Sequence, residues 1–192
     1  AAGETTLAFA PISKDSKLKT VSFGADVCLV PLNHPDMNGI DQVSRGSKEP
    51  FVIRGPGEYE AASVTVAGYP STSKYGGKER INTVYTVDFD GMTLLYLGAL
   101  ADEKLPAAIT EEMEDIDILF VPIGGEGALD PREAAKLTVA LEPRVVIPIL
   151  CEDKEALKIF LKEYGEDAVK PVDKLTIKAK EAATKEGEVI VL

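Results

Sequence analysis

Histidine and cysteine are scarce in this 192-residue sequence, which has one histidine, two cysteines and no tryptophan. A single histidine, His34, is too few for a site that gathers several imidazoles around a metal ion. The two cysteines, Cys28 and Cys151, are too few for a disulfide framework, so reduced thiols and a cytoplasmic location are expected. No apolar run approaches the roughly 20 residues of a membrane span, and no secretory leader is recognisable.

Basic residues are also in short supply, with 21 Lys and Arg against 32 Asp and Glu and a formal net charge of -11. Nucleic acids and anionic membrane surfaces both require a basic face, so neither is expected as a partner. Hydrophobic residues make up 45% of the chain and charged residues 28%, which is typical of a folded globular protein. We expect a single acidic domain over residues 1–192, because no linker divides the chain.

The first half of the chain is rich in strand patterns. The clearest is a hairpin, in which the β-rich runs Thr83–Phe89 and Met92–Leu97 flank an Asp90-Gly91 turn. Polar loops are predicted for Pro70–Gly77 and for the turn-forming residues 55–59, and a short helix for Asn38–Val43. Further strands are predicted for Thr5–Phe9, Val27–Val30, Phe51–Ile53 and Ser63–Gly68.

The second half alternates apolar strand patterns with helices. Asp130 followed by Pro131 predicts a helix start, with that helix ending near Leu141. A second amphipathic helix should be capped by Glu152 or Asp153 and end at Gly165. The pattern alone indicates one α/β or α+β domain. The remaining predictions are a helix over Leu105–Met113 and strands over Ile116–Ile123, Val145–Ile149, Leu175–Ala179 and Val189–Leu192.

The most informative stretch runs from Val27 to Gly39, where an apolar strand ends in a short polar loop. The loop Leu32-Asn33-His34-Pro35-Asp36-Met37 resembles the His-x-His-x-Asp-His signature of metal-dependent hydrolases of the metallo-β-lactamase fold. Two further segments, Gly55–Glu60 and the Val-Ile-Pro strand ending at Ile149, are similar to a bacterial branch of that family. The resemblance implies a four-layer αββα sandwich with the polar loop at one edge of the sheets.

Most positions that the resemblance assigns to metal ligands carry other residues. Leu32 and Met37 stand where the signature has histidines, and the loop around Thr72 has no histidine. A residue that helps to brace the histidine loop, an aspartate in the family, is Ala10 here. The other two implied ligand positions are Ala99, in the place of an aspartate, and Leu150, in the place of a histidine.

His34 and Asp36 are therefore the only remnants of the implied ligand set. Two protein ligands are too few for a tight zinc site, so no cofactor is expected. We expect a degenerate member that is metal-free and inactive as a hydrolase, acting as a binding or structural protein or as an engineered scaffold. The alternative is a metal-dependent hydrolase, with zinc, whose reduced or rebuilt site uses His34, Asp36 and Cys151; Cys151 and His34 could also form a nucleophile pair.

The start of the chain suggests a further expectation. Members of the resembling family begin with a strand that carries Gly-His-Ser, whereas this sequence begins Ala1-Ala2-Gly3. If that strand is absent, Thr5–Phe9 becomes an open edge strand, which invites pairing with another chain. A homo-oligomer formed through this edge is therefore expected.

Overall fold

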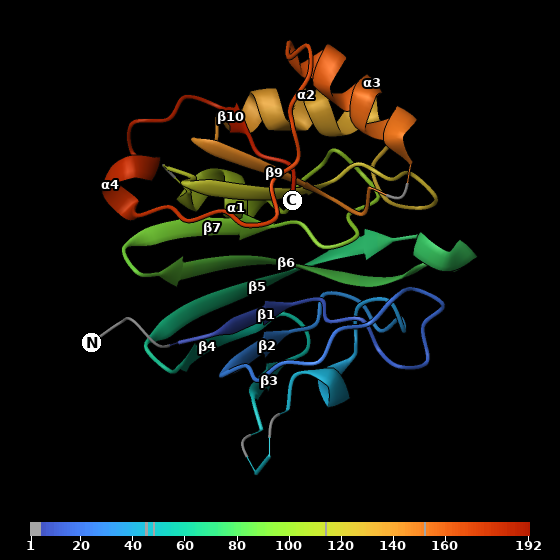
Figure 1. The fold of residues 1–192 in the computed structure, drawn as a ribbon, viewed down its shortest axis with the longest axis vertical. Coiled ribbons are helices and arrows are strands. Elements are labelled where there is room, and N and C mark those ends of the chain that lie inside the picture. The colour runs from blue at the N-terminus through green and yellow to red at the C-terminus, as the bar shows by residue number, and fades with distance from the viewer. Residues whose placement is uncertain (1–4, 45, 48, 114, 152) are drawn as a thin grey trace.

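The structure consists of two facing β-sheets with helices packed mainly against the outer face of the larger one (Figure 1). A computed structural model describes residues 5–44, 46–47, 49–113, 115–151 and 153–192. The predicted fold class, an α+β protein with two sheets, is confirmed. In Figure 1 the small sheet lies at the bottom beside β4 and β5, and α2 and α3 lie at the top.

The small sheet contains three parallel strands in the order β1-β2-β3, which are Leu7–Phe9, Val27–Leu29 and Phe51–Ile53. Because side chains alternate across a strand, Val27 and Leu29 face the large sheet, whereas Cys28 faces outward. A small apolar cluster covers Cys28 on that outer face, together with the 3-10 turn Ile40–Gln42. The central strand β2 is completely buried as a result.

The large sheet has the strand order β10-β9-β8-β7-β6-β5-β4, and its described pairings change from antiparallel to parallel at β7. Its inner face, with Leu94 and Tyr96 of β7, packs on the small sheet, and its outer face, with Leu95, packs on the helices. The strands are β4 Gly57–Ala61, β5 Val64–Ser73, β6 Arg80–Phe89, β7 Met92–Tyr96, β8 Ile118–Pro122, β9 Val145–Ile149 and β10 Glu188–Val189.

The helices begin and end where local sequence signals place them. In α2 (Pro131–Leu141) the Asp130 side chain accepts hydrogen bonds from the backbone N–H groups of Arg132 and Glu133, and Glu133 completes the capping box. In α3 (Lys154–Tyr164) Asp153 is the N-cap, and Gly165 ends the helix in the left-handed conformation. Two short helices are α1, Ala107–Glu112, and α4, Ala179–Ala182.

The sequence-based assignments were wrong in four places, and one alternative lies outside the described residues. Of the predicted strand Val189–Leu192 only Val189 lies in a strand, β10. Residues 175–178 have no regular secondary structure; Leu175 and Ile177 pack into the core between the sheets without pairing to a strand. The predicted turn over residues 55–59 is shorter, because β4 begins at Gly57. The predicted loop Pro70–Gly77 is strand as far as Ser73. Glu152, the alternative cap of α3, is not among the described residues.

Pro70 is tolerated within β5 because of its position in the ladder. It pairs with Thr83 of β6, but the Thr83 N–H donates away from β5, to the carbonyl of Pro31 at 2.9 Å. Opposite residues of antiparallel strands alternate between bonded and non-bonded pairs. Pro70 sits in a non-bonded pair and therefore removes no hydrogen bond from the sheet.

Within the described chain no helix has the length and apolar character needed to span a membrane.

The buried thiol of Cys28 should make stability depend on pH above the neutral range. Burial raises the pKa of Cys28 to about 12, whereas the unfolded thiol ionises near 8.5. As the pH rises, the Cys28 thiol therefore loses its proton in the unfolded state first. Above a pH of about 8.5 the free energy of unfolding should fall for this reason by about 1.4 kcal/mol per pH unit. Urea unfolding of the wild type and Cys28→Ala between pH 8 and 10 should show a shallower decline for the variant. Cys151→Ala is the exposed control, and an equal change in slope there would contradict the assignment.

Candidate functional site

Several loops meet at one edge of the two sheets, on the right-hand side of Figure 1. They follow the carboxyl ends of parallel strands β1, β2, β8 and β9, and the loop after β5 joins them. Two backbone hydrogen bonds tie this region together: Lys74 N–H to the Gly127 carbonyl at 2.8 Å, and Ser13 N–H to the Pro35 carbonyl at 2.7 Å. Ligand sites of α/β sheets commonly lie at such an edge, so this is the candidate functional site.

The centre of this edge is an apolar cluster, which we call the loop cluster. Its buried members come from the loops after β2, β5, β7 and β8, and two partly buried residues from the ends of β1 and β9 pack against them. Five of the implied ligand or bracing positions lie in this cluster, so the structure brings together residues that the sequence places far apart. The members are Leu32, Met37, Tyr75, Ala99 and Ala128, with Ala10 and Leu150 alongside.

Thr72 lies outside the loop cluster. Its side chain is exposed, and its carbonyl accepts a hydrogen bond from the Ala101 N–H at 3.0 Å. Tyr75, three residues further on, fills the cluster instead and is 8% exposed. Sequence reasoning missed Tyr75 because it assigned residues 70–77 to a surface loop, and an aromatic residue inside a Ser-, Lys- and Gly-rich segment was the only available signal.

Asp36 is held by two hydroxyl groups. Ser16 Oγ donates a short hydrogen bond to Asp36 Oδ1, and the Tyr75 hydroxyl donates to Oδ2 at 3.0 Å. The carboxylate side chain is only 15% exposed. Because a buried charge needs hydrogen-bond partners, these two donors allow Asp36 to remain inside the fold without a cation beside it.

His34 is confined by the same residues. The Asp36 N–H donates to His34 Nδ1 at 3.3 Å, and Asp36 Oδ2 lies 3.4 Å from the same nitrogen. The ring meets Tyr75 edge-on, with a centroid separation of 5.1 Å. A Cβ on Gly76, which has a φ of +69°, would lie 2.9 Å from His34 Nε2. In this arrangement the lone pair of a neutral ring at Nδ1 is already engaged by the backbone.

The donor set does not fit a catalytic zinc ion. No three His, Cys, Asp or Glu residues of the described chain are placed to hold a metal together. Cys151 is exposed, and its Sγ donates to the Asp153 carbonyl at 3.5 Å. A catalytic zinc ion takes three protein ligands, whereas the implied ligand positions in and beside the loop cluster carry hydrocarbon side chains and one thioether, and the Tyr75 hydroxyl of the cluster already donates to Asp36.

A polar cavity of 420 Å³ opens beside His34 and Asp36, with the charged residues Asp15, Lys17 and Glu126 also in its wall. Residues 1–150 of the chain match the family model for the Beta-lactamase superfamily domain. The chain belongs to this superfamily.

Related sequences and structures agree with this assignment. The chain is 33% identical over 89 residues to a UPF0173 metal-dependent hydrolase of Thermococcus kodakarensis (43% of this chain, 40% of the relative). It is 36% identical over 92 residues to a Pyrococcus furiosus relative of the same description (47% and 40%). The chain thus spans about two fifths of the length of the curated relatives that it matches.

A solved Thermotoga maritima structure, assigned to the Zn-dependent hydrolases of the metallo-β-lactamase superfamily, covers nearly the whole chain. It superimposes with a TM-score of 0.71 and 26% identity, over 97% of this chain and 90% of that one. The fold of the superfamily is therefore present throughout the described part of the chain.

Within this metallo-β-lactamase fold, Asn82 holds the turn that carries Ala99. Its buried amide donates to the Leu97 carbonyl at 3.0 Å and to Ser71 Oγ at 2.8 Å, and its Oδ1 accepts from the Ala99 N–H at 2.9 Å. A Cβ on Gly98 would come within 2.5 Å of Asn82 Oδ1. Position 98 therefore requires glycine. The hydrogen bond from Asn82 fixes the backbone of Ala99, although the methyl side chain of Ala99 has no atom that could bind a metal ion.

Two non-glycine residues beside the loop cluster have left-handed backbone conformations, as does Glu126 in the wall of the polar cavity. Ala10 has a φ of +44° and Leu150 a φ of +52°. This region costs an L-residue roughly 1–2 kcal/mol, and such strain is concentrated at functional sites of proteins. Both residues border the loop cluster, so the backbone there keeps a strained shape although the side chains are plain hydrocarbon.

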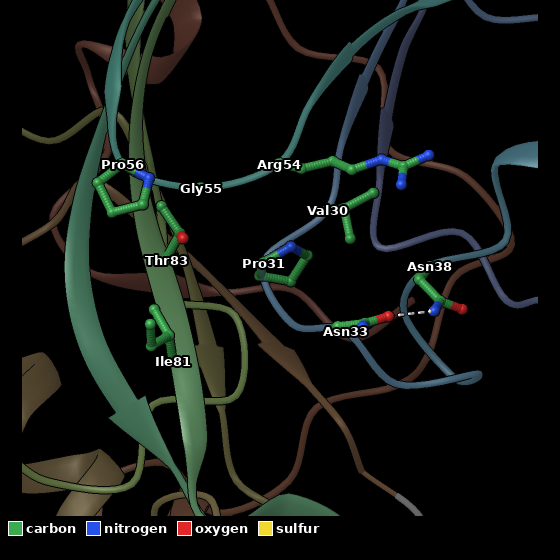
Figure 2. A pocket seen from close by; sticks show the side chains of 9 residues that line it. All are labelled: Val30, Pro31, Asn33, Asn38, Arg54, Gly55, Pro56, Ile81 and Thr83. Carbon is green, nitrogen blue, oxygen red and sulfur yellow. Dashed lines mark hydrogen bonds between the residues drawn. The ribbon is translucent and has the colours of Figure 1, made fainter.

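A separate cavity of 390 Å³ lies between the loop after β2, the end of β3 and strand β6 (Figure 2). Asn38 Nδ2 donates to Asn33 Oδ1 at 2.8 Å on one side of it. Figure 2 shows the Arg54 side chain extending away from Thr83 and Ile81. Among the described residues that line this cavity, the polar side chains are an exposed arginine, a threonine and two amides joined by one hydrogen bond, and none of these is a carboxylate or an imidazole.

Relieving the strain at Ala10 should stabilise the protein. In Ala10→Gly the left-handed conformation no longer places a Cβ against the backbone, and the free energy of unfolding should rise by about 0.5–1 kcal/mol. The matched control, Ala8→Gly in β1, removes a buried methyl without relieving strain and should destabilise. Urea denaturation measures both. A loss of stability in Ala10→Gly as large as that in the control would show that the strain argument is wrong.

Proposed function

We propose that this chain keeps the metallo-β-lactamase fold without its metal centre and is not a metal-dependent hydrolase. The observation that supports the proposal is the loop cluster, in which apolar side chains pack against one another at the positions where the resemblance implies ligands. A cation placed among Leu32, Met37, Ala99 and Leu150 would lose its hydration and gain no oxygen or nitrogen ligand from these side chains, which is strongly unfavourable. The positive function left to this edge of the fold is binding.

The surroundings of Asp36 support the same proposal. In a metal site a carboxylate is compensated by the cation, whereas here the hydroxyls of Ser16 and Tyr75 donate to both of its oxygens. A buried carboxylate without these donors would destabilise the fold. The hydroxyls therefore give Asp36 a stable environment that does not require a metal ion.

The alternative function is metal-dependent hydrolysis with a reduced site of His34, Asp36 and Cys151. Two observations favour it: the relatives are described as metal-dependent hydrolases, and Asp36 and Cys151 line one cavity. In such a site zinc would act as a Lewis acid and lower the pKa of bound water toward roughly 7. The three residues would have to converge on one ion, a rearrangement that His34, packed between Tyr75 and Gly76, opposes.

Metal analysis decides between the two proposals. Protein purified without chelator should contain far less than one equivalent of zinc per chain, and EDTA should leave its melting temperature unchanged, because no binding free energy links metal to folding. Elemental analysis and thermal unfolding measure these quantities. Stoichiometric zinc, with a large fall in melting temperature on chelation, would instead establish the reduced site, and Cys151→Ala should then lower the zinc content.

Restoring the implied ligands is the complementary experiment. Leu32→His, Met37→His, Ala99→Asp and Leu150→His together should lower stability in the apo state, because they bury polar groups in the loop cluster. Added zinc should then raise the melting temperature. A folded quadruple variant that zinc does not stabilise would contradict the assignment of these positions.

We also propose that the protein is cytoplasmic and binds neither membranes nor nucleic acids.

We further propose that the protein associates with itself through β1. In the described chain β1 is an edge strand that pairs only with β2. The Thr6 carbonyl accepts from Val27 N–H, and Ala10 N–H donates to the Leu29 carbonyl, so the backbone groups of Leu7 and Phe9 face the open side. No charged side chain or proline lies within β1 to discourage pairing.

Light scattering should therefore show a mass that rises with protein concentration. Amide hydrogen exchange at Leu7 and Phe9 should slow as the mass rises, because these N–H groups would become hydrogen-bonded across the new edge. Exchange at Val87, which is buried in the large sheet, serves as the control and should not change. A monomer at all concentrations would exclude this association.

A further inference from the structure

A second cavity of the functional edge, with a volume of 480 Å³, differs in character from the polar one. Its floor is the inner face of the large sheet at the ends of β7, β8 and β9, where Tyr96, Phe120, Ile147 and Ile149 lie side by side. Its volume is within the roughly 300–1,000 Å³ that small-molecule sites occupy. The two cavities meet, because Asp36 lines both.

Three aromatic rings give the floor a defined shape. The ring of Phe9 stacks on that of Phe120 with centroids 5.5 Å apart, and it lies 5.0 Å from the ring of Tyr96. The rings of Tyr96 and Phe120 are separated by 5.9 Å. Such clustered aromatic rings hold one another in place, so this apolar surface exists before any ligand arrives.

The hydroxyl of Tyr96 is the unusual group in this cavity. Tyr96 is 4% exposed, yet its hydroxyl has no hydrogen-bond partner among the residues that the structure describes. In that same part of the chain, every side-chain polar atom that is fully sealed from solvent has a partner. The Tyr96 hydroxyl must therefore reach open space, and the space that its side chain lines is this cavity. A buried hydroxyl seldom goes without a partner, which indicates that one is supplied from outside the chain.

The charged groups around the cavity indicate which kind of ligand can accept a hydrogen bond from the Tyr96 hydroxyl. Burial raises the pKa of Tyr96 well above its ordinary value, so the hydroxyl stays protonated and can donate. Asp36 in the same wall repels anions, and both of its carboxylate oxygens already accept hydrogen bonds. A carboxylate ligand would therefore be disfavoured, whereas a neutral carbonyl oxygen can accept from Tyr96.

We propose that this cavity binds a neutral, mainly apolar small molecule whose carbonyl oxygen accepts a hydrogen bond from the Tyr96 hydroxyl. The apolar part of the ligand lies on Phe9, Phe120 and the isoleucines of β9, and its carbonyl group points to the end of β7. The proposal rests on the binding function proposed above and gives it a ligand class. The Tyr96 hydroxyl and the aromatic floor lie outside the implied ligand set, whereas Asp36 in the cavity wall belongs to it.

The probes are 2-nonanone and nonanoate, which share a chain length and differ in charge. Methyl resonances of Ile147, Ile149 and Leu150 report on the cavity, and the titrations are run in EDTA so that metal plays no part. The ketone should shift these resonances saturably, and nonanoate should bind more weakly. Tyr96→Phe should raise the dissociation constant of the ketone about 5- to 10-fold, the effect of losing one hydrogen bond.

Two controls separate the proposed contact from a general loss of structure. Tyr164→Phe alters a hydroxyl that donates to the Gly187 carbonyl, and neither residue lines the cavity; it should leave ketone affinity unchanged. Cys151→Trp places bulk on an exposed residue of the cavity rim and should abolish binding in a protein that still unfolds cooperatively.

Several results would overturn the proposal. These are the absence of saturable shifts with the ketone, equal ketone affinity in the wild type and Tyr96→Phe, or tighter binding of nonanoate. Shifts of the same methyl groups caused by protein concentration alone would identify a second copy of the chain as the occupant. Because chelator is present throughout, a failure here is distinct from the detection of zinc in the purified protein, which tests the proposed absence of the metal centre.

Discussion

The contact among Leu32, Met37, Tyr75, Ala99 and Ala128 is the interaction on which the functional edge depends. It joins loops from both sheets, so the small sheet is fixed at this end through side chains as well as through the core between the sheets. An apolar cluster stabilises by removing hydrocarbon surface from water and requires no partner of defined charge. Burial of this cluster therefore stabilises the edge, and the hydrogen bonds of Asn82 and Tyr75 fix individual loops around it.

Local signals made much of the fold predictable. The Asp130-Pro131 pair, the Asp90-Gly91 turn and Gly165 all act within a few residues of where they stand, and the structure has a helix start, a hairpin turn and a helix end at these points. The strand prediction for Leu175–Ala179 was wrong for a physical reason. Its alternating apolar residues do face the core, but alternation reports which side is buried and does not show that a neighbouring strand is present to pair with.

The site was only partly predictable from the sequence. A known signature allowed Leu32, Met37, Ala99 and Leu150 to be selected, and they lie together, but their packing around Tyr75 depends on contacts between residues far apart in the chain. The free hydroxyl of Tyr96 could not be foreseen either, because Tyr96 reads as an ordinary residue of a buried strand. The fold itself leaves the chemistry open, and the two cavities that meet at Asp36 offer one polar and one apolar surface.

The two cysteines have different surroundings, so thiol reagents should react selectively with one of them. Cys28 is enclosed beneath the small sheet and resists ionisation, whereas Cys151 stands exposed at the rim of the apolar cavity. Because a reagent must reach the sulfur atom and Cys151 is the exposed one of the two cysteines, a maleimide or spin label should attach at Cys151 and not at Cys28. The sequence thus carries one accessible labelling site at the mouth of its candidate binding site, where fluorescence or distance measurements can follow the loops without further substitutions.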